Sequence, residues 1–354
     1  FKGVATLLGS RTTSYRTALL WASVTTFAGS IAAFFLAQKL MTNFSGKGLV
    51  PDQVVQLASF SVSVSIAAAL TVFLATRFGF PISTTHAITG ALVGAGLLAS
   101  SEGINLDKLV STFFLPLLVS PLMAILGASV FYPSLSFLRK RLGITRESCL
   151  CIGNEVLMPA PKNLAMGSSA AMIQVQCCPQ ISVGTNITCE ERYLGQVWGL
   201  SAKSLIDSAH VLSAGLVGFA RGLNDTPKIA AILLVGHLVD PLLSIALVAI
   251  TMGAGGFIYA KKIAETMSYQ ITEMNDGQGL SANLITSLVV IGASQLGVPV
   301  STTHVSCGSL FGIGAVTKGA HWGAILKIVL AWLITLPVAG TLGFVAFAIL
   351  KGIL

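Results

Sequence analysis

The sequence predicts an all-α protein that crosses a membrane several times and is built from two related halves. Three observations lead to this fold class. Hydrophobic residues make up 54% of the 354 residues and charged residues only 10%, whereas soluble domains carry about 25% charged residues. Several apolar segments reach the ~20 residues that a bilayer-spanning helix requires. One short polar motif also occurs twice, once in each half.

Uninterrupted apolar segments predict the membrane-spanning helices. At a rise of about 1.5 Å per residue, each of them is long enough to cross the hydrocarbon core of a bilayer. The 36 glycines of the chain suit helices that pack closely within a membrane. The predicted spans are Thr17–Lys39, Lys108–Leu142, Val239–Lys262 and Trp322–Leu350.

Other apolar segments are interrupted by polar turns, which predicts broken helices and re-entrant hairpins. Unpaired backbone inside a membrane is tolerated only where it lines a cavity. These turns are therefore expected to face a binding site. The flanking segments are Val54–Phe80 with Ala87–Ala99, Ala282–Val298 with Val305–Val316, and Ser204–Ala220 with Lys228–Gly236, the last pair being separated by Arg221–Pro227.

The long polar region at residues 143–203 predicts a polar, Cys-containing cytoplasmic insert. It separates a first transmembrane repeat at residues 1–142 from a second, inverted repeat at residues 204–354. Basic clusters at Arg139–Arg141 and Lys261–Lys262 predict which ends of the spans face the cytoplasm, because positive charge in short loops marks the cytoplasmic side. Thiols in that compartment stay reduced.

The internal repeat relates the two halves. The motif Pro81–His86 recurs as Pro299–His304, at an offset of 218, the difference between 299 and 81. A second match, at an offset of 226, aligns Phe1-Lys2 with Pro227-Lys228. The basic clusters direct the first spans of the two halves in opposite senses, so the repeats are predicted to be inverted. Inverted repeats with interrupted helices are typical of secondary transporters that bind their substrate at the repeat interface.

Two Ser-Thr-Thr triplets are the candidate anion-binding residues. Ser and Thr cap helix N-termini, and the first turn of the following helix offers free N–H groups to an oxyanion. Inversion would bring both helix ends to one centre, with donors on several faces of a tetrahedral anion. The alternative is that each triplet only caps its helix, but two near-identical copies favour the anion site. The residues are Ser83, Thr84, Thr85, Ser301, Thr302 and Thr303.

Asn224 and Asp225 predict a cation site. A carboxylate within a membrane segment costs about 3 kcal/mol on insertion scales, so it is a functional candidate. Carboxylate and amide oxygens are hard ligands that suit Na⁺ as a bound metal ion, and a carboxylate can equally carry a proton. A salt bridge to Arg221 or Lys228 is the structural alternative. Lys228 would either balance the acid or contact the anion, and Lys2 is its counterpart by the offset of 226.

His86 and His304 directly follow the two triplets. Histidine can donate to an anion or relay protons near neutral pH. A structural role, with the ring packed against the helix turn and hydrogen-bonded there, is the alternative. The sequence leaves both interpretations open.

At these motifs the chain resembles the inorganic phosphate transporter (PiT) family. That family carries a Gly-x-Asn-Asp and a Pro-x-Ser-x-Thr-His motif in each half. The second half shows both, as Gly222–Asp225 and Pro299–His304, and the first half shows Pro81–His86. The resemblance covers nearly the whole chain. It implies a symporter that needs no cofactor and couples phosphate to Na⁺ or H⁺, with phosphate held by the Ser-Thr-Thr turns and the cation by the Asn-Asp motifs.

The first half departs from the family pattern because it lacks an Asn-Asp motif. The offset of 226 places that motif just before Phe1. We therefore expect the native chain to extend further at its N-terminus, so that the first repeat is incomplete here. The resemblance also implies a multi-pass protein of the plasma (inner) membrane, and the Gly-rich helices are compatible with a homodimer.

Other functions are weighed against phosphate symport. A symporter of sulfate or another oxyanion shares the tetrahedral geometry, and the discriminating feature is an acceptor for the phosphate proton, which sulfate lacks at neutral pH. An anion channel is a further alternative, marked by flux that never concentrates its substrate. An enzyme is not expected, because a symmetric duplicate is not what a single nucleophile needs. The scattered basic residues do not form the footprint of a nucleic-acid-binding protein.

Overall fold

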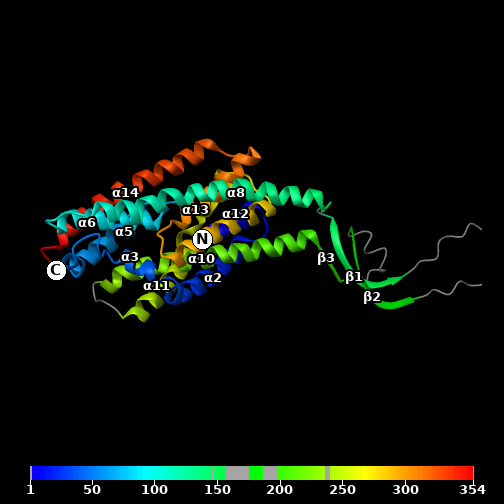
Figure 1. Ribbon diagram of the computed structural model, residues 1–354, viewed down its shortest axis with the longest axis horizontal. Coiled ribbons are helices and arrows are strands. Elements are labelled where there is room, and N and C mark those ends of the chain that lie inside the picture. Colours follow the sequence, from blue (N-terminus) through cyan, green and yellow to red (C-terminus); the bar gives the residue numbers. More distant parts are fainter. Residues whose placement is uncertain (1, 146, 157–174, 186–197, 236–239, 354) are drawn as a thin grey trace, which may run out of the picture. The chain divides into compact units, whose positions relative to one another are not determined.

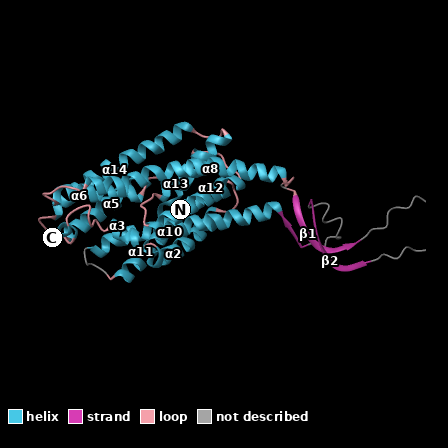
Figure 2. Cartoon of the chain, in the orientation of Figure 1, coloured by secondary structure: helices cyan, strands magenta, loops and turns pink. Residues whose placement is uncertain are grey.

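The computed structural model describes residues 2–145, 147–156, 175–185, 198–235 and 240–353. The chain forms two compact units, which we call the helical unit and the strand unit. The helical unit comprises Phe1–Pro133 and His210–Leu354, and the strand unit comprises Ser134–Ala209. Figures 1 and 2 show the helices and strands of each.

Helices joined by short turns make up the helical unit (Figure 1). Two of them, α8 (Leu115–Arg141) and α10 (Ala202–Val235), continue into the strand unit. Two π-helical turns, η1 (Leu109–Phe114) and η2 (Thr266–Gln270), extend neighbouring helices. The other helices are α1 (Lys2–Gly9), α2 (Tyr15–Leu36), α3 (Gln38–Phe44), α4 (Asp52–Val55), α5 (Ala58–Phe78), α6 (Thr84–Ala99), α7 (Leu106–Lys108), α11 (Pro241–Glu265), α12 (Asp276–Leu296), α13 (Thr302–Thr317) and α14 (Trp322–Leu350).

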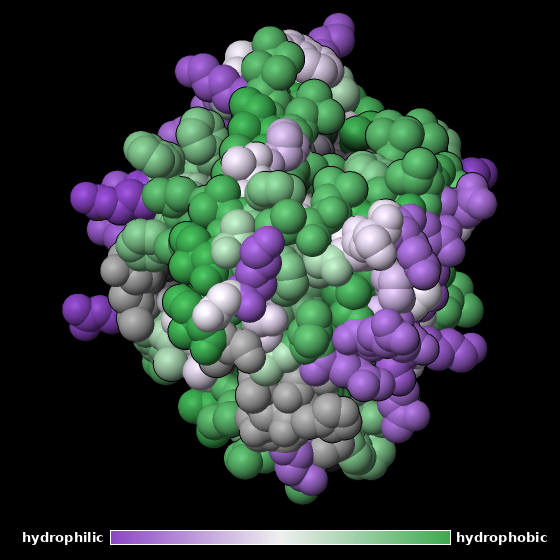
Figure 3. All heavy atoms as spheres, turned by 90° about the vertical axis from the view of Figure 1, so that its left-hand side faces the viewer, coloured by the Kyte–Doolittle hydropathy of each residue, from purple (hydrophilic) through white to green (hydrophobic). Residues whose placement is uncertain are grey.

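Long apolar helices confirm the prediction of an all-α, multi-pass membrane protein. Within the described residues, five helical segments are long and apolar enough to cross a bilayer, or six if the bent pair in α11 and η2 counts as one span. Large hydrophobic side chains are exposed on these helices, for example Phe35 (72%) and Leu333 (66%). Hydrophobic residues cover much of the face that Figure 3 shows. Lipid is the solvent that such a surface requires.

The two halves share one helix plan. Helices α5 and α12 begin at Ala58 and Asp276, and α6 and α13 begin at Thr84 and Thr302. Each pair differs by 218, the offset of the sequence repeat, and the partners also end at equivalent residues. Both turns open on a glycine with a positive φ, 79° at Gly79 and 76° at Gly297. A residue with a side chain would be strained at this φ. Glycine at both positions therefore allows the same turn in each hairpin.

Each hairpin packs against the last long helix of the opposite half. Helix α6 lies along α14, and a Cβ added to Gly94 would overlap the Gly340 carbonyl. Helix α13 lies along α8, and a Cβ added to Gly312 would overlap the Ile125 carbonyl. Small residues allow helix backbones to approach closely in a membrane. Each half therefore packs its hairpin against a helix of the other half, and the tips of both hairpins lie inside the helical unit.

One sequence prediction is wrong. The segment Arg221–Pro227 was expected to interrupt a helix, but α10 runs without a break from Ala202 to Val235, with Pro227 inside it. Packing accounts for the difference, because a Cβ on Gly222 would overlap the Thr26 carbonyl of α2. Membrane helices also tolerate an internal proline where neighbouring helices surround it. The backbone carbonyls of residues 221–227 therefore lie within a continuous helix.

The strand unit contains a small antiparallel sheet. Its strand order is β2-β1-β3, with β1 at Ser148–Val156, β2 at Val175–Thr185 and β3 at Trp198–Ser201. The predicted insert, residues 143–203, falls within this unit. Its cytoplasmic position and the limits of the two repeats stay predictions.

Candidate functional site

The two Ser-Thr-Thr turns form the N-terminal caps of α6 and α13. The hydroxyl oxygen of Ser83 accepts a hydrogen bond from the backbone N–H of His86 at 3.1 Å. The Ser301 oxygen accepts from the N–H of His304 at the same distance. Both serines are buried. Capping uses an acceptor lone pair of each serine, so each hydroxyl hydrogen can still be donated to a ligand.

The tips of the two hairpins bond to each other reciprocally. The Thr85 hydroxyl donates to the Val300 carbonyl at 3.1 Å, and the Thr303 hydroxyl donates to the Ile82 carbonyl at 2.8 Å. Thr303 and Thr85 are 218 positions apart, and so are Val300 and Ile82. Each bond is thus the repeat-equivalent of the other, which is the pattern that a two-fold axis between the tips produces.

Helix α10 supplies a third group of donors at this junction. The Lys228 ammonium donates to the Val300 carbonyl at 2.6 Å and to the Thr85 hydroxyl at 2.9 Å. The Asn224 amide donates to the same carbonyl at 3.1 Å. With Thr85, three donors converge on an oxygen that has two lone pairs. The junction therefore gathers three hydrogen-bond donors on one backbone carbonyl, and such a cluster of donors suits an anion.

Asp225 provides the negative charge of the junction. Its carboxylate accepts hydrogen bonds from the Asn224 amide at 3.0 Å and from the Thr302 hydroxyl at 3.4 Å. It also lies 3.7 Å from the Arg221 guanidinium and 3.9 Å from the Lys228 ammonium. The structural alternative for Asp225, a salt bridge to these residues, is thus present. Two cations and one carboxylate leave a net charge of +1 here, which favours an anion.

The predicted cation ligands occupy one buried site. Asn224 and Asp225 are 0% and 2% exposed. The Asn224 amide oxygen accepts from the Ser294 hydroxyl of α12 at 3.2 Å. Together with the Val300 carbonyl these groups are hard oxygen ligands of the kind that Na⁺ uses. Within the described residues, no group of three His, Cys, Asp or Glu side chains has the arrangement of a transition-metal site.

The rings of the two repeat-equivalent histidines, one from each hairpin, are in contact with each other. The ring centroids of His86 and His304 are 4.3 Å apart, and the Trp332 ring stacks on His304 at 3.8 Å. The Trp332 indole N–H donates to the Pro81 carbonyl at 2.9 Å. Stacking orients these rings as part of the packing of the tips, and the ligand-binding and structural interpretations of the two histidines both stay predictions. The Nδ1 atom of His86 is buried and has no hydrogen-bond partner in the described part of the chain.

The structure brings together nearly all of the predicted site residues. Ser83, Thr85, Ser301, Thr302 and Thr303 lie at the junction with the α10 residues described above. Thr84 is the first residue of α6 and is partly buried. The side chain of Lys2 lies outside the described residues.

Three groups at the junction were missed by sequence reasoning. They are the Val300 carbonyl, Ser294 and Trp332. A backbone carbonyl leaves no mark in a sequence. Ser294 and Trp332 sit in helices whose local pattern is that of any apolar membrane segment, so only the tertiary contact identifies them.

A second buried polar network joins α1, α10 and α12 and was also not predicted. The Asn283 amide donates to the hydroxyls of Thr6 at 2.9 Å and Ser213 at 3.1 Å. Near it, the Thr12 hydroxyl donates to Asp276 at 2.7 Å and lies 3.2 Å from the His210 ring. These bonds connect the half-buried end of α12 to the helix that carries Asp225.

Sequence comparison with known proteins finds a family and several relatives that match nearly the whole chain. Residues 1–343 match the model of the phosphate transporter family. A protein of Thermococcus kodakarensis named as a putative phosphate permease is 26% identical over 382 residues, covering 98% of this chain and 92% of the relative. A protein of Bacillus subtilis named as a probable low-affinity inorganic phosphate transporter is 25% identical, covering 98% and 90%.

A solved structure has the same fold. It is a sodium-dependent phosphate transporter, with a TM-score of 0.68 and 22% sequence identity, and the match covers 99% of this chain and 94% of the other. At this identity the likeness concerns the arrangement of the helices alone.

Proposed function

Because this chain belongs to the phosphate transporter family, we propose that it imports inorganic phosphate together with Na⁺ or H⁺ by alternating access. One observation carries the proposal, the convergence of Thr85, Asn224 and Lys228 on the single Val300 carbonyl. A tetrahedral anion between the hairpin tips would accept hydrogen bonds from these donors when they turn from the carbonyl toward it. Membership in a family of transporters also confirms the prediction that the chain is not an enzyme.

The junction supports phosphate rather than sulfate as the substrate. Phosphate carries a proton at neutral pH and must donate it to an acceptor, whereas sulfate has none to donate. The Asp225 carboxylate, which accepts the Thr302 hydroxyl and offers about four lone-pair positions, is an acceptor at the site. A buried acceptor facing a bare sulfate oxygen would be left unsatisfied, at a cost of about 1–3 kcal/mol.

Lys228 offers two ways to couple the anion to a cation. Its ammonium holds the Val300 carbonyl and Thr85 hydroxyl, which are oxygen atoms that a Na⁺ would also use. Co-transported Na⁺ would then bind beside Asp225 only after Lys228 has turned toward phosphate. A proton carried by Lys228 or Asp225 needs no such exchange of ligands. In both schemes the Asp225 carboxylate offsets the charge of the arriving cation.

Uptake of radiolabelled phosphate into proteoliposomes tests the function and identifies the ion. We expect accumulation under an inward Na⁺ gradient or an inward H⁺ gradient, and no competition from excess sulfate. Accumulation under Na⁺ would support ligand exchange at Lys228, and accumulation under H⁺ would support proton carriage. Equilibration without accumulation would indicate a channel, and competition by sulfate would indicate a general oxyanion carrier.

Asp225→Asn keeps the shape of the side chain and removes its charge. We expect at least a ~10-fold loss of gradient-driven accumulation, because the cation would lose its counter-charge. Asp52→Asn, at an exposed position of α4, is the matched control and should accumulate phosphate normally. Equal amounts of each variant in the membrane must be shown first. Normal accumulation by Asp225→Asn would remove this residue from the coupling mechanism.

A further inference from the structure

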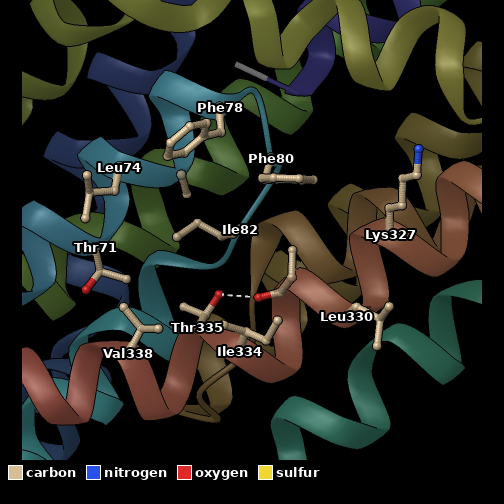
Figure 4. Close-up of a pocket in the computed structure, with 12 residues that line it drawn as sticks. Thr71, Leu74, Phe78, Phe80, Ile82, Lys327, Leu330, Ile334, Thr335 and Val338 are labelled. Carbon is tan, nitrogen blue, oxygen red and sulfur yellow. Dashed lines mark hydrogen bonds between the residues drawn. The ribbon is translucent and has the colours of Figure 1, made fainter.

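A groove on the outside of the helical unit lies between α5 and α14, next to the tip of the first hairpin (Figure 4). Its volume is about 480 Å³. Leu74 and Phe78 of α5 form one wall, and Leu330 and Ile334 of α14 form the other. Both helices are apolar enough to span a membrane, and these side chains are exposed. The groove therefore opens toward lipid.

Hydrocarbon makes up the surface of the groove. Its two threonines are hydrogen-bonded within their own helices, Thr71 to the Ala67 carbonyl at 2.7 Å and Thr335 to the Ala331 carbonyl at 2.6 Å. The dashed line in Figure 4 marks the second bond. A polar ligand would find few hydrogen-bond partners in this groove. An alkyl chain forms no hydrogen bonds, so it would lose none by entering the groove.

The groove carries a positive charge at one end. Lys327 is exposed, and Figure 4 shows it at the opposite end of the α14 wall from Val338. Within the described part of the chain, no acidic side chain pairs with it. A charged group at this depth is stable only if it reaches the headgroup region. Lys327 is thus available to an anion at the membrane surface.

The dimensions of the groove match one leaflet of a bilayer. Helix α14 has 29 residues and is about 43 Å long, which exceeds the ~30 Å hydrocarbon core by about 6 Å at each end. Lys327, five residues after Trp322, lies about 7 Å from the start of the helix, at the edge of the hydrocarbon. From Lys327 to Val338 the helix rises about 16 Å, roughly half of the core.

We propose that this groove binds one anionic phospholipid, with an acyl chain between α5 and α14 and its phosphate beside Lys327. The chain would lie against Phe80 and Ile82, which line the groove at the hairpin tip between Lys327 and Val338. The Ile82 carbonyl accepts the Thr303 hydroxyl of the other hairpin. A bound acyl chain would therefore support the tip at which the two halves meet, and anionic lipid would stabilise the protein.

Photolabelling of the purified full chain in phosphatidylcholine vesicles tests the site. The probe is phosphatidylglycerol with a diazirine in its acyl chain, and labelled peptides are located by mass spectrometry. We expect labels on both walls, at residues 71–82 and 327–338, that unlabelled phosphatidylglycerol displaces at least fivefold better than phosphatidylcholine. Equal displacement by both lipids, or labels spread evenly over all membrane helices, would overturn the proposal.

Two pairs of variants separate the headgroup from the acyl chain. Lys327→Gln should abolish the preference for phosphatidylglycerol, whereas Lys351→Gln, exposed at the other end of α14, should keep it. Ala331→Phe should fill the groove and reduce labelling by either lipid, whereas Ala348→Phe, exposed outside the groove, should not. Retained preference in Lys327→Gln would refute the headgroup contact. The readout is lipid binding, so it does not depend on phosphate transport.

Discussion

At the scale of single residues, Lys228 is the most informative side chain of the protein. It is fully buried, and a buried ammonium is retained only when it is paired and hydrogen-bonded. Its partners are the Thr85 hydroxyl, the Val300 carbonyl and, at 3.9 Å, the Asp225 carboxylate. A buried ion pair adds little net stability compared with apolar packing. The charge at Lys228 is therefore explained better by a ligand than by the fold.

Lys228→Met tests that explanation, because methionine keeps an unbranched side chain and removes the charge. We expect phosphate affinity to fall at least ~10-fold, since hydrogen bonds to charged groups contribute about 1.5–3 kcal/mol. Binding of radiolabelled phosphate to the purified protein by a scintillation proximity assay measures this. Lys351→Met, at an exposed position, is the control. Wild-type affinity in Lys228→Met would leave this residue with a structural role only.

At the scale of helices, glycine contacts decide how the hairpins are held. Helix α6 approaches α14 so closely at Gly94 that a methyl group would meet the Gly340 backbone. The Gly340 backbone cannot rotate away from an added methyl group as a side chain can. The two helices would therefore have to move apart. By contrast, a Cβ on Gly292 of α12 would meet nothing within 4 Å. The same residue type therefore has a packing role at one position and none at the other.

This contrast predicts different effects of the same substitution. Gly94→Ala should destabilise the protein by about 1–3 kcal/mol through overpacking. Gly292→Ala should be neutral or stabilise α12 by up to ~1 kcal/mol, because alanine is the better helix former. Melting temperatures of the purified variants in one detergent measure both effects. Equal melting temperatures would show that α6 and α14 are not in close contact in the membrane.

At the scale of the whole molecule, the two hairpins are related by more than sequence. Their helices have equivalent bounds, their tips exchange equivalent hydrogen bonds, and each packs on the long helix of the other half. The reciprocal bonds are the contacts that must be exchanged if the halves move against each other. This arrangement supports inverted repeats, in which the hairpins enter the membrane from opposite sides.

Cysteine labelling in oriented vesicles tests the inversion. Ser101 and Lys318 are exposed directly after α6 and α13, and each is replaced by cysteine in a chain whose six native cysteines are serines. A membrane-impermeant maleimide should label Ser101→Cys from the outside and Lys318→Cys from the cytoplasmic side. Labelling of both from one side would mean that the repeats are parallel.

The amino-acid sequence alone predicted the membrane class, three of the long apolar spans, the duplicated motif and the candidate site residues. These follow from local signals, namely apolar length, turn residues and a duplicated motif. The remaining features depend on packing between distant parts of the chain. This packing kept α10 continuous through Asn224 and Asp225, brought Ser294 and Trp332 to the junction, and made the Val300 carbonyl a common acceptor. Contacts between residues 70 to 251 positions apart have no local signature, because they depend on packing between helices and not on the helices themselves.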